Sequence, residues 1–281
     1  MKYNFAVIGD PVEHSLGPVL HSELARQIDM ELSYSKIHVT SESLEEIVSE
    51  LKSGKYDGIN ITLPLKRRMM EFLDETDLAA DQIQAANCVQ STAGILKGIN
   101  TDYIGFDRLL ELNNIDMTDK KCVVIGAGGV ARAILFSLKN YKLKELIIIN
   151  RTRQHAQEIL GAMETWANNF PVSVQQIENA RNVCETSDVI INCTSVGLFP
   201  EILISPIPLQ YINSSHVLID TIYTPLKTQF LKFGDMNSAR VINGLDMFIA
   251  QGIASLEFWT NQSIFDKINF QNIRDILSKS I

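Results

Sequence analysis

One short window, KKCVVIGAGGVARAI at residues 120–134, constrains the fold of this chain more than any other. A pattern typical of a buried strand runs directly into the spacing Gly126-x-Gly128-x-x-Ala131, and a helix-like pattern follows. In such a unit the first glycine permits a tight turn, the second lets the backbone approach a pyrophosphate, and a small third residue lets the helix pack closely. The window therefore predicts a dinucleotide site at a helix N-terminus, whereas the glycines alone would often mark only a flexible turn.

The end of the next predicted strand indicates which dinucleotide is bound. NAD-binding proteins generally carry Asp or Glu about 20 residues after the glycines, where it holds the ribose hydroxyls. Here that position reads Asn150-Arg151-Thr152-Arg153. A guanidinium suits a 2′-phosphate, which an acidic side chain would repel, so we predict NADP rather than NAD. In the alternative reading the two arginines are solvated residues that open the next helix, but cations at a helix N-terminus oppose its dipole.

Strand-sized and helix-like segments alternate along the chain. Residues 44–54, for example, carry apolar residues at helical spacing, after a capping-box spacing at Ser43 and Glu46. This alternation predicts an α/β fold with parallel sheets, of the Rossmann type around the glycine window. The predicted strands are residues 5–8, 32–39, 58–62, 122–125, 146–150, 189–192 and 217–220.

The length and a break in the pattern indicate two units. A chain of 281 residues is expected to form two packed units or one large α/β unit. A polar stretch at residues 113–121 separates an amphipathic helix, 103–112, from a fresh buried strand. Two helical segments, 245–260 and 270–278, have no strand after them and are expected to pack back on the first unit.

Charge and composition exclude several classes of function. The net charge of −8 argues against a nucleic-acid surface, which needs clustered Lys and Arg. No apolar run approaches the roughly 20 residues that span a bilayer, and residues 1–5 lack the apolar segment of a signal peptide. We therefore expect a cytoplasmic protein with no membrane partner. The four cysteines form no CxxC pair and the five histidines show no ligand spacing, so buried, reduced thiols and no metal are expected.

Polar residues also follow the strand predicted at 189–192. Asn192, Thr194, Ser195 and Gly197 lie where strand ends line the cofactor crevice in this kind of fold. Ordinary turn chemistry explains the same residue types equally well, and both readings can hold together.

Lys66 and Asp102 are the candidate groups for the reaction. Pro64 ends the strand GINIT, which puts Lys66 at the rim of the sheet, and Asp102 opens the helix that joins the two predicted units. The active site is expected in a cleft at that junction. A Lys and an Asp facing one another there could move a hydroxyl proton during carbonyl reduction. Taken alone, Lys66 would more often be a surface lysine and Asp102 a helix N-cap.

Nine collinear segments between residues 7 and 259 resemble the shikimate dehydrogenase family. They are VIGDPVEHSLGPVLH, GINITLPLK, AANC, GINTDYIGF, VIGAGGVARAI, INRT, INCTSVG, DTIYTPLKT and GLDMFIAQGIASLEFW. The resemblance implies NADPH-dependent reduction of 3-dehydroshikimate to shikimate, a step of aromatic amino acid biosynthesis. It also implies that Lys66 and Asp102 are the catalytic pair, that residues 1–101 with 244–281 bind the substrate, and that residues 102–243 bind NADP.

Further site residues follow from the resemblance, position by position. A small ring with a carboxylate and hydroxyls needs short, neutral hydrogen-bonding groups, and the matching substrate positions supply them. They are Ser15, Thr62, Asn87, Tyr223 and Gln251, with Gly17 beside Ser15. Read without the resemblance, Gln251 could be an exposed helix residue and Tyr223 a core residue. The implied cofactor positions are Gly126, Ala127, Gly128, Gly129, Val130, Asn150, Arg151, Thr152, Arg153, Thr194, Ser195, Thr221 and Gly244.

The chain departs from the family pattern at Gly17. The family usually reads Ser-x-Ser, where this chain has Ser15-Leu16-Gly17. A lost hydrogen bond to a carboxylate costs about 1.5–3 kcal/mol unless a water or a backbone N–H replaces it. The change is also expected to open space where quinate carries an extra hydroxyl, so a shikimate/quinate dehydrogenase is an alternative. Thr221, where a larger apolar residue is more usual, is a milder departure.

Two other classes stay open on the sequence. A non-catalytic NADPH and metabolite sensor is disfavoured because a buried catalytic pair is costly to keep without use. A folate-type NADP dehydrogenase would leave the substrate motifs unexplained. We expect a monomer or a homodimer.

Overall fold

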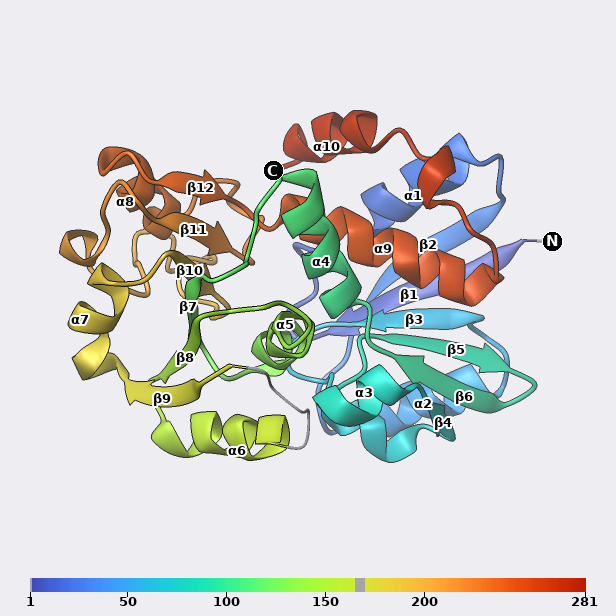
Figure 1. The fold of residues 1–281 in the computed structure, drawn as a ribbon. Coiled ribbons are helices and arrows are strands. Elements are labelled where there is room, and N and C mark those ends of the chain that lie inside the picture. The colour runs from blue at the N-terminus through green and yellow to red at the C-terminus, as the bar shows by residue number, and fades with distance from the viewer. Residues whose placement is uncertain (1, 165–169) are drawn as a thin grey trace. The chain divides into compact units, whose positions relative to one another are not determined.

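The computed structural model describes residues 2–164 and 170–281. The chain divides into two compact units, of which the first runs to Gly105 and resumes at Ile249–Ser280, and the second is Phe106–Phe248 with Ile281 (Figure 1). The boundaries fall within helices α4 (Asp102–Leu112) and α9 (Leu245–Thr260). We describe each unit by itself. In the part of the chain that the structure describes, no helix has both the length and the apolar character of a membrane span.

The first unit is built on a six-stranded sheet in the order β2-β1-β3-β5-β6-β4. β1 (Tyr3–Gly9) pairs parallel with β2 (Leu32–His38) and with β3 (Gly58–Ile61). β5 (Cys88–Thr92) runs antiparallel to β3 and to β6 (Ile95–Ile99), and β4 (Glu75–Thr76) pairs parallel with β6.

This sheet is therefore mixed, and the prediction of parallel strands is wrong for β5. Ala93 and Gly94 join β5 to β6 with φ values of 52° and 81°. A two-residue turn with positive φ angles connects antiparallel neighbours, since parallel strands need a long crossover.

Helices cover both faces of the first sheet. They are α1 (Gly17–Gln27), α2 (Leu44–Lys52), α3 (Leu78–Ile83), part of α9, and α10 (Phe270–Ser278). Ala6 and Ile8 of β1 belong to one core cluster with the apolar face of α2. Phe5 points to the opposite face, where its ring stacks 4.3 Å from Trp259 of α9. The predicted capping box is wrong, because Ser43 makes no side-chain cap and its Oγ instead accepts from Thr40 N (3.0 Å).

The second unit is a six-stranded sheet in the order β12-β11-β10-β7-β8-β9, and every neighbouring pair is parallel. This is the predicted doubly wound sheet, and the strand order reverses between β10 and β7. Its strands are β7 (Lys121–Ile125), β8 (Glu145–Asn150), β9 (Val172–Gln176), β10 (Val189–Asn192), β11 (Val217–Asp220) and β12 (Arg240–Ile242). Its helices are α5 (Gly129–Leu138), α6 (Arg153–Glu164), α7 (Ala180–Glu185) and α8 (Gln229–Met236), with part of α4 and α9.

Candidate active site

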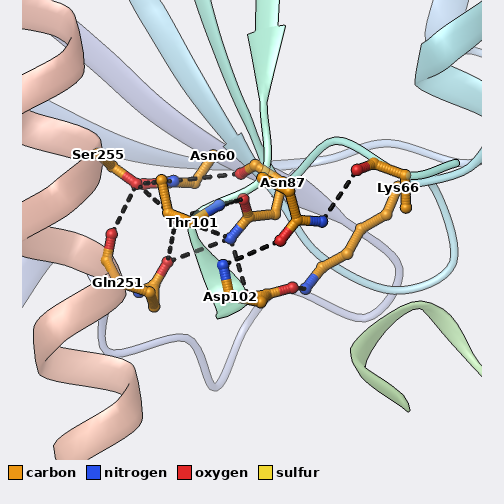
Figure 2. Close-up of polar contacts among 9 residues, drawn as sticks. Asn60, Lys66, Asn87, Thr101, Asp102, Gln251 and Ser255 are labelled. Carbon is orange, nitrogen blue, oxygen red and sulfur yellow. Dashed lines mark hydrogen bonds and ion pairs between the residues drawn. The ribbon is translucent and has the colours of Figure 1, made fainter. Parts of the chain in front are cut away.

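Lys66 and Asp102 form a buried ion pair in the first unit. Lys66 Nζ lies 2.6 Å from Asp102 Oδ2, and the two side chains are 11% and 7% exposed (Figure 2). Lys66 follows the fully buried Leu65 on the turn after β3, and its carbonyl accepts a hydrogen bond from Ala86 N (3.0 Å). Lys66 is thus no surface lysine. A charge pair so shielded from bulk water can hold an ammonium proton at a defined point.

Asn87 fixes the carboxylate of this pair. Asn87 Oδ1 accepts a hydrogen bond from Thr101 N (2.6 Å), and a backbone N–H can only donate, so this contact sets the orientation of the amide. Asn87 Nδ2 then faces Asp102 Oδ1 at 2.8 Å. Asp102 N also donates to Asn100 Oδ1 (3.0 Å). One oxygen of Asp102 therefore binds Asn87 while the other binds Lys66.

Two residues of α9, Gln251 and Ser255, reach the same network (Figure 2). Gln251 Oε1 lies 3.5 Å from both Asn87 Nδ2 and Thr101 Oγ1, and the residue is half-buried. Ser255 Oγ accepts from Asn60 Nδ2 (2.9 Å) and lies 3.2 Å from Thr101 Oγ1. The exposed-helix reading of Gln251 is therefore wrong.

The space beside Gly17 is bordered by Tyr34 and Ser15. A Cβ on Gly17 would lie 2.9 Å from Tyr34 Cε1, 3.2 Å from the Tyr34 hydroxyl and 3.3 Å from Ser15 Oγ. Ser15 Oγ already accepts from Gly17 N (3.2 Å), and the Tyr34 hydroxyl donates to Asn60 Oδ1 (2.8 Å). The expectation that the missing side chain opens space is not met, because the ring of Tyr34 stands where a side chain would project.

The two remaining substrate candidates, Thr62 and Tyr223, belong to different units. Thr62 is half-buried at the end of β3, where its N donates to Ile8 O (2.9 Å) and its O accepts from Leu65 N (3.1 Å). Tyr223 is in the second unit, and its ring stacks 4.3 Å from that of Phe248. The predicted cleft between the domains stays a prediction.

The glycine turn of the second unit fits a dinucleotide. Gly126 has φ +114°, and a Cβ there would lie 3.1 Å from the backbone of Cys193, so only glycine suits the turn. Gly128 is exposed, and a Cβ on it would meet nothing within 4 Å. Gly128 precedes α5 without a side-chain cap, and the first turn of α5 has no acidic residue. Open space beside a glycine and uncapped N–H groups at a helix start are what a pyrophosphate site needs, so this turn remains the candidate. Ala127, Gly129 and Val130 are half-buried there.

The segment after β8 presents the predicted cationic side chains. Arg151, Thr152 and Arg153 are exposed, and Arg153 begins α6. Asn150 Nδ2 donates to Thr152 O (2.8 Å), which shapes the turn at the end of the strand. Two guanidinium groups free to approach a 2′-phosphate are the donor type that NADP requires.

A buried carboxyl organises the other strand ends of the second unit. Asp220 accepts hydrogen bonds from Asn192 Nδ2 (3.0 Å), Ile222 N (3.1 Å) and Thr228 Oγ1 (2.5 Å). Burial raises the pKa of Asp220 to about 6, against the opposing effect of these hydrogen bonds. Asn192 Oδ1 in turn accepts from Thr194 N and Oγ1 (3.0 and 2.7 Å). Asp220 thus ties the ends of β10 and β11 to the N-cap of α8.

The remaining cofactor candidates surround this network. Ser195 is exposed beyond β10, and Thr221 is half-buried, with its N donating to Asn192 O (3.0 Å). A Cβ on Gly244 would collide with the carbonyl of Thr221, so the backbone approach there requires glycine.

Sequence reasoning did not single out four residues of the first-unit network, Asn60, Tyr34, Thr101 and Ser255. Asn60 is a polar residue inside the buried strand β3, and that contrast is a signal the sequence carries. Ser255 follows Gln251 by one helical turn in a mostly apolar helix, which is a second such signal. Nothing in the sequence indicates that Tyr34 of β2 approaches Gly17.

Comparison with known proteins gives a consistent result. The family model described as "Shikimate dehydrogenase substrate binding domain" matches residues 7–89, and the one described as "Shikimate / quinate 5-dehydrogenase" matches residues 109–205. A shikimate dehydrogenase (NADP(+)) of Methanosphaera stadtmanae is 36% identical over 258 residues, 92% of this chain and 91% of that protein.

Solved structures agree with the sequence matches. The shikimate 5-dehydrogenase of Thermus thermophilus in complex with NADP(H) and shikimate has a TM-score of 0.87 at 29% identity, covering 99% of this chain and 100% of that one. The shikimate 5-dehydrogenase of Listeria monocytogenes in complex with shikimate and NAD has a TM-score of 0.86 at 26% identity, covering 98% and 96%.

Proposed function

The chain belongs to the shikimate dehydrogenase family, and from this premise we propose that it is an oxidoreductase that interconverts 3-dehydroshikimate and shikimate with NADP(H). The observation that carries the proposal is the buried Lys66–Asp102 pair, whose carboxylate Asn87 holds. Lys66 and Asn87 lie within the segment that matches the substrate-binding-domain model. The reaction serves aromatic amino acid biosynthesis. Residues 1–101 with 244–281 hold the substrate, and residues 102–243 hold NADP.

Lys66 supplies the proton in the direction of reduction. NADPH, when bound, supplies the hydride that forms the new C–H bond. The carbonyl oxygen then needs a proton to become a hydroxyl, and the Lys66 ammonium donates it from Nζ. Asp102 holds the ammonium 2.6 Å away, and Asn87 holds Asp102, so that Nζ keeps one position as the proton leaves. In shikimate oxidation the neutral amine of Lys66 accepts the same proton.

The substrate is held by neutral hydrogen-bonding groups. Ser15 and the backbone at Gly17 face its carboxylate, and the ring hydroxyls bind the other candidates. These are Thr62, Asn87, Tyr223 and Gln251.

The cofactor is held by backbone and by cations. The turn Gly126, Ala127, Gly128, Gly129 and Val130 takes the pyrophosphate at the start of α5, where the helix dipole favours an anion. Arg151 and Arg153, with Asn150 and Thr152, take the 2′-phosphate. The ends of β10 and β11 take the nicotinamide half through Thr194, Ser195, Thr221 and Gly244.

The proposal includes a cytoplasmic location and either a monomer or a homodimer. Cys88, Cys122, Cys184 and Cys193 are all free and buried, which suits the reducing cytoplasm. A monomer or a homodimer is compatible with the reaction, because Lys66, Asp102 and Asn87 come from one chain.

A steady-state assay of the purified protein at fixed pH tests the proposal. Shikimate and quinate are each oxidised with NADP+ and with NAD+, and the four kcat/KM values are compared. We expect shikimate with NADP+ to be the best combination, with quinate much poorer because Tyr34 borders Gly17. Comparable quinate turnover would establish the shikimate/quinate alternative, and no turnover with binding of NADPH would establish the sensor.

A further inference from the structure

The β1–α1 loop (residues 10–16) is held by one face of the edge strand β2. Alternate residues of a strand point to the same side, so Tyr34 and Lys36 share a face. The ring of Tyr34 stands beside the first residue of α1, and Lys36 Nζ donates a hydrogen bond to Glu13 O. Strand β2 thus places an ammonium group on the loop that carries the proposed donor to the substrate carboxylate.

The Lys36 ammonium is held close to that donor, Ser15. Ser15 N donates to Val12 O (3.0 Å), so residues 12–15 form a tight turn that contains Glu13. Two residues span at most about 7 Å, so Lys36 Nζ, bonded to Glu13 O, lies within about 10 Å of Ser15. This is about one Debye length at 0.1 M ionic strength, so the charge of Lys36 acts on an anion bound at Ser15.

No carboxylate among the described residues pairs with this ammonium. The hydrogen bond of Lys36 goes to a neutral carbonyl, and Lys36 forms no ion pair within the described part of the chain. The acidic side chains of the loop have other partners, since Asp10 Oδ1 lies 2.9 Å from His38 Nε2 and Glu13 Oε2 accepts from Val12 N (3.1 Å). The first turn of α1 has no acidic residue either. The loop therefore presents a positive charge to a ligand.

The groups proposed to contact the substrate carboxylate carry no charge of their own. They are the hydroxyl of Ser15 and the backbone at Gly17. A cation within about 10 Å stabilises a charged carboxylate and has no comparable effect on an uncharged ester. Lys36 is placed to supply this charge.

We propose that Lys36 is a specificity-determining residue, whose ammonium attracts the substrate carboxylate through space and so favours the anionic acid over an uncharged analogue. The inference rests on the proposed function, in which the carboxylate binds at Ser15. Lys36 does not touch the reacting atoms, so its effect is expected in the KM for shikimate and not in kcat. Because Lys36 is exposed, salt should weaken the effect.

Lys36→Gln tests this, because glutamine keeps an N–H donor for Glu13 O and removes the charge. At low ionic strength we expect Lys36→Gln to raise the shikimate KM about three- to fivefold, with kcat and the NADP+ KM within about 1.5-fold of wild type. Lys36→Arg, which keeps the charge, should stay near wild type. The KM for shikimate methyl ester should not change in either variant. At about 0.5 M salt the difference in shikimate KM between Lys36→Gln and wild type should fall below about twofold.

Lys2→Gln is the matched control. Lys2 is also exposed, and it precedes β1 at the end away from the β1–α1 loop, roughly 20 Å along the strand. Lys2→Gln removes the same charge from the same sheet and should leave the KM values for shikimate and its ester unchanged.

Other results would overturn the inference. An equal rise in KM for shikimate and for its ester would mean that Lys36 only holds the loop. An unchanged shikimate KM in Lys36→Gln, or the same rise in Lys2→Gln, would mean that Lys36 has no part in specificity. If the wild type does not oxidise the ester, the salt dependence of the shikimate KM decides in the same way. Wild-type turnover of shikimate with NADP+ is measured first, so that failure of the proposed function appears in the wild type and failure of this inference appears only in the variants.

Discussion

The same pair of residue types plays two different parts in the first unit. Lys52 and Asp74 lie 3.4 Å apart with side chains 44% and 37% exposed, whereas Lys66 and Asp102 lie 2.6 Å apart at 11% and 7%. Water screens the exposed pair, which contributes little. The buried pair is shielded from water and is held by fixed hydrogen-bond partners instead. Removing one member therefore leaves the other as a buried charge with no counter-charge. Burial and neighbours, more than residue type, therefore give Lys66 its role.

Asp220 is also a buried carboxyl, but its hydrogen-bond partners are an amide, a backbone N–H and a hydroxyl instead of a lysine. Its pKa in the folded protein, about 6, lies above its ordinary value of 3.8 because burial disfavours the charged form. Between these two pH values the folded state binds more protons than the unfolded state. Asp220 therefore stabilises the fold most below pH 4, and this contribution is lost as the pH rises through 6.

Replacing Asp220 by Asn should remove this pH dependence. We expect the free energy of unfolding of wild type, relative to Asp220→Asn, to fall by up to about 3 kcal/mol between pH 4 and pH 7. Urea denaturation of both proteins at a series of pH values measures the free energies of unfolding. The contributions of the other titrating groups cancel when one free energy is subtracted from the other. A difference that stays constant with pH would mean that Asp220 is not protonated in the fold.

At the scale of elements, the turn between β7 and α5 contains two glycines with different structural roles. Gly126 has φ +114°, and a Cβ on it would lie 3.1 Å from the backbone of Cys193, so the fold itself requires glycine there. Gly128 has φ −86° and open space beside it, so nothing in the fold requires it. The proposed reason for Gly128 is the approach of the pyrophosphate.

Alanine substitutions separate these roles. Gly128→Ala should keep its Tm within about 2 °C of wild type and weaken NADPH binding at least about tenfold, because the methyl group occupies the proposed pyrophosphate site. Gly126→Ala should lose about 1 kcal/mol or more of stability through its positive φ. Gly161→Ala on α6, also with open space, is the control and should gain about 0.5–1 kcal/mol with unchanged NADPH binding. Calorimetry measures the Tm and stability of each variant, and a fluorescence titration measures its affinity for NADPH. Normal NADPH affinity in Gly128→Ala would contradict the assignment of this turn.

The elements that the sequence predicts well are those with a strong local pattern. All seven predicted strands are confirmed within two residues. Six of them are short runs of mostly buried residues, whereas β2 (Leu32–His38) is half-exposed and has no fully buried residue. The strands β4, β5, β6, β9 and β12 were not predicted, since they are short or half-exposed and depend on neighbours for their pairing. The antiparallel direction of β5 depends on the turn at Ala93 and Gly94, whose conformation the composition does not reveal.

At the scale of the whole molecule, the proposed substrate and cofactor residues fall largely in different units. Lys66, Asn87 and Gln251 belong to the first unit, and Gly128 and Arg151 belong to the second. Each unit has its own sheet and its own core cluster. Each ligand should therefore stabilise chiefly the unit that binds it.

Hydrogen exchange with one ligand at a time tests this division. NADPH alone should slow amide exchange around residues 126–130 and 150–153, and shikimate alone should slow it around residues 15–17, 66 and 87. AMP, which lacks the 2′-phosphate and the nicotinamide half of NADPH, is the control. Protection of residues 126–130 by shikimate alone, equal to that by NADPH, would contradict the division.

The site was only partly predictable, because it gathers residues far apart in the chain. Local motifs indicated the glycine turn and Arg151, and made Lys66 and Asp102 candidates. The resemblance then implied that these two are the catalytic pair and added Asn87. The chain that links Asn60, Thr101 and Ser255 spans 195 residues from Asn60 to Ser255, so only the packing of α9 on the sheet reveals it. The sequence also could not predict how much space Gly17 leaves, because the ring that borders it belongs to Tyr34 on β2.

The most direct test of the account compares Lys66→Met with Lys52→Met in shikimate oxidation by NADP+. Both changes remove a lysine paired with an aspartate, and only the first removes the buried one. We predict that Lys66→Met lowers kcat by at least about 100-fold while NADPH binds with wild-type affinity, and that Lys52→Met leaves both unchanged. Near-normal turnover by a folded Lys66→Met enzyme would contradict the central claim that Lys66 moves the proton.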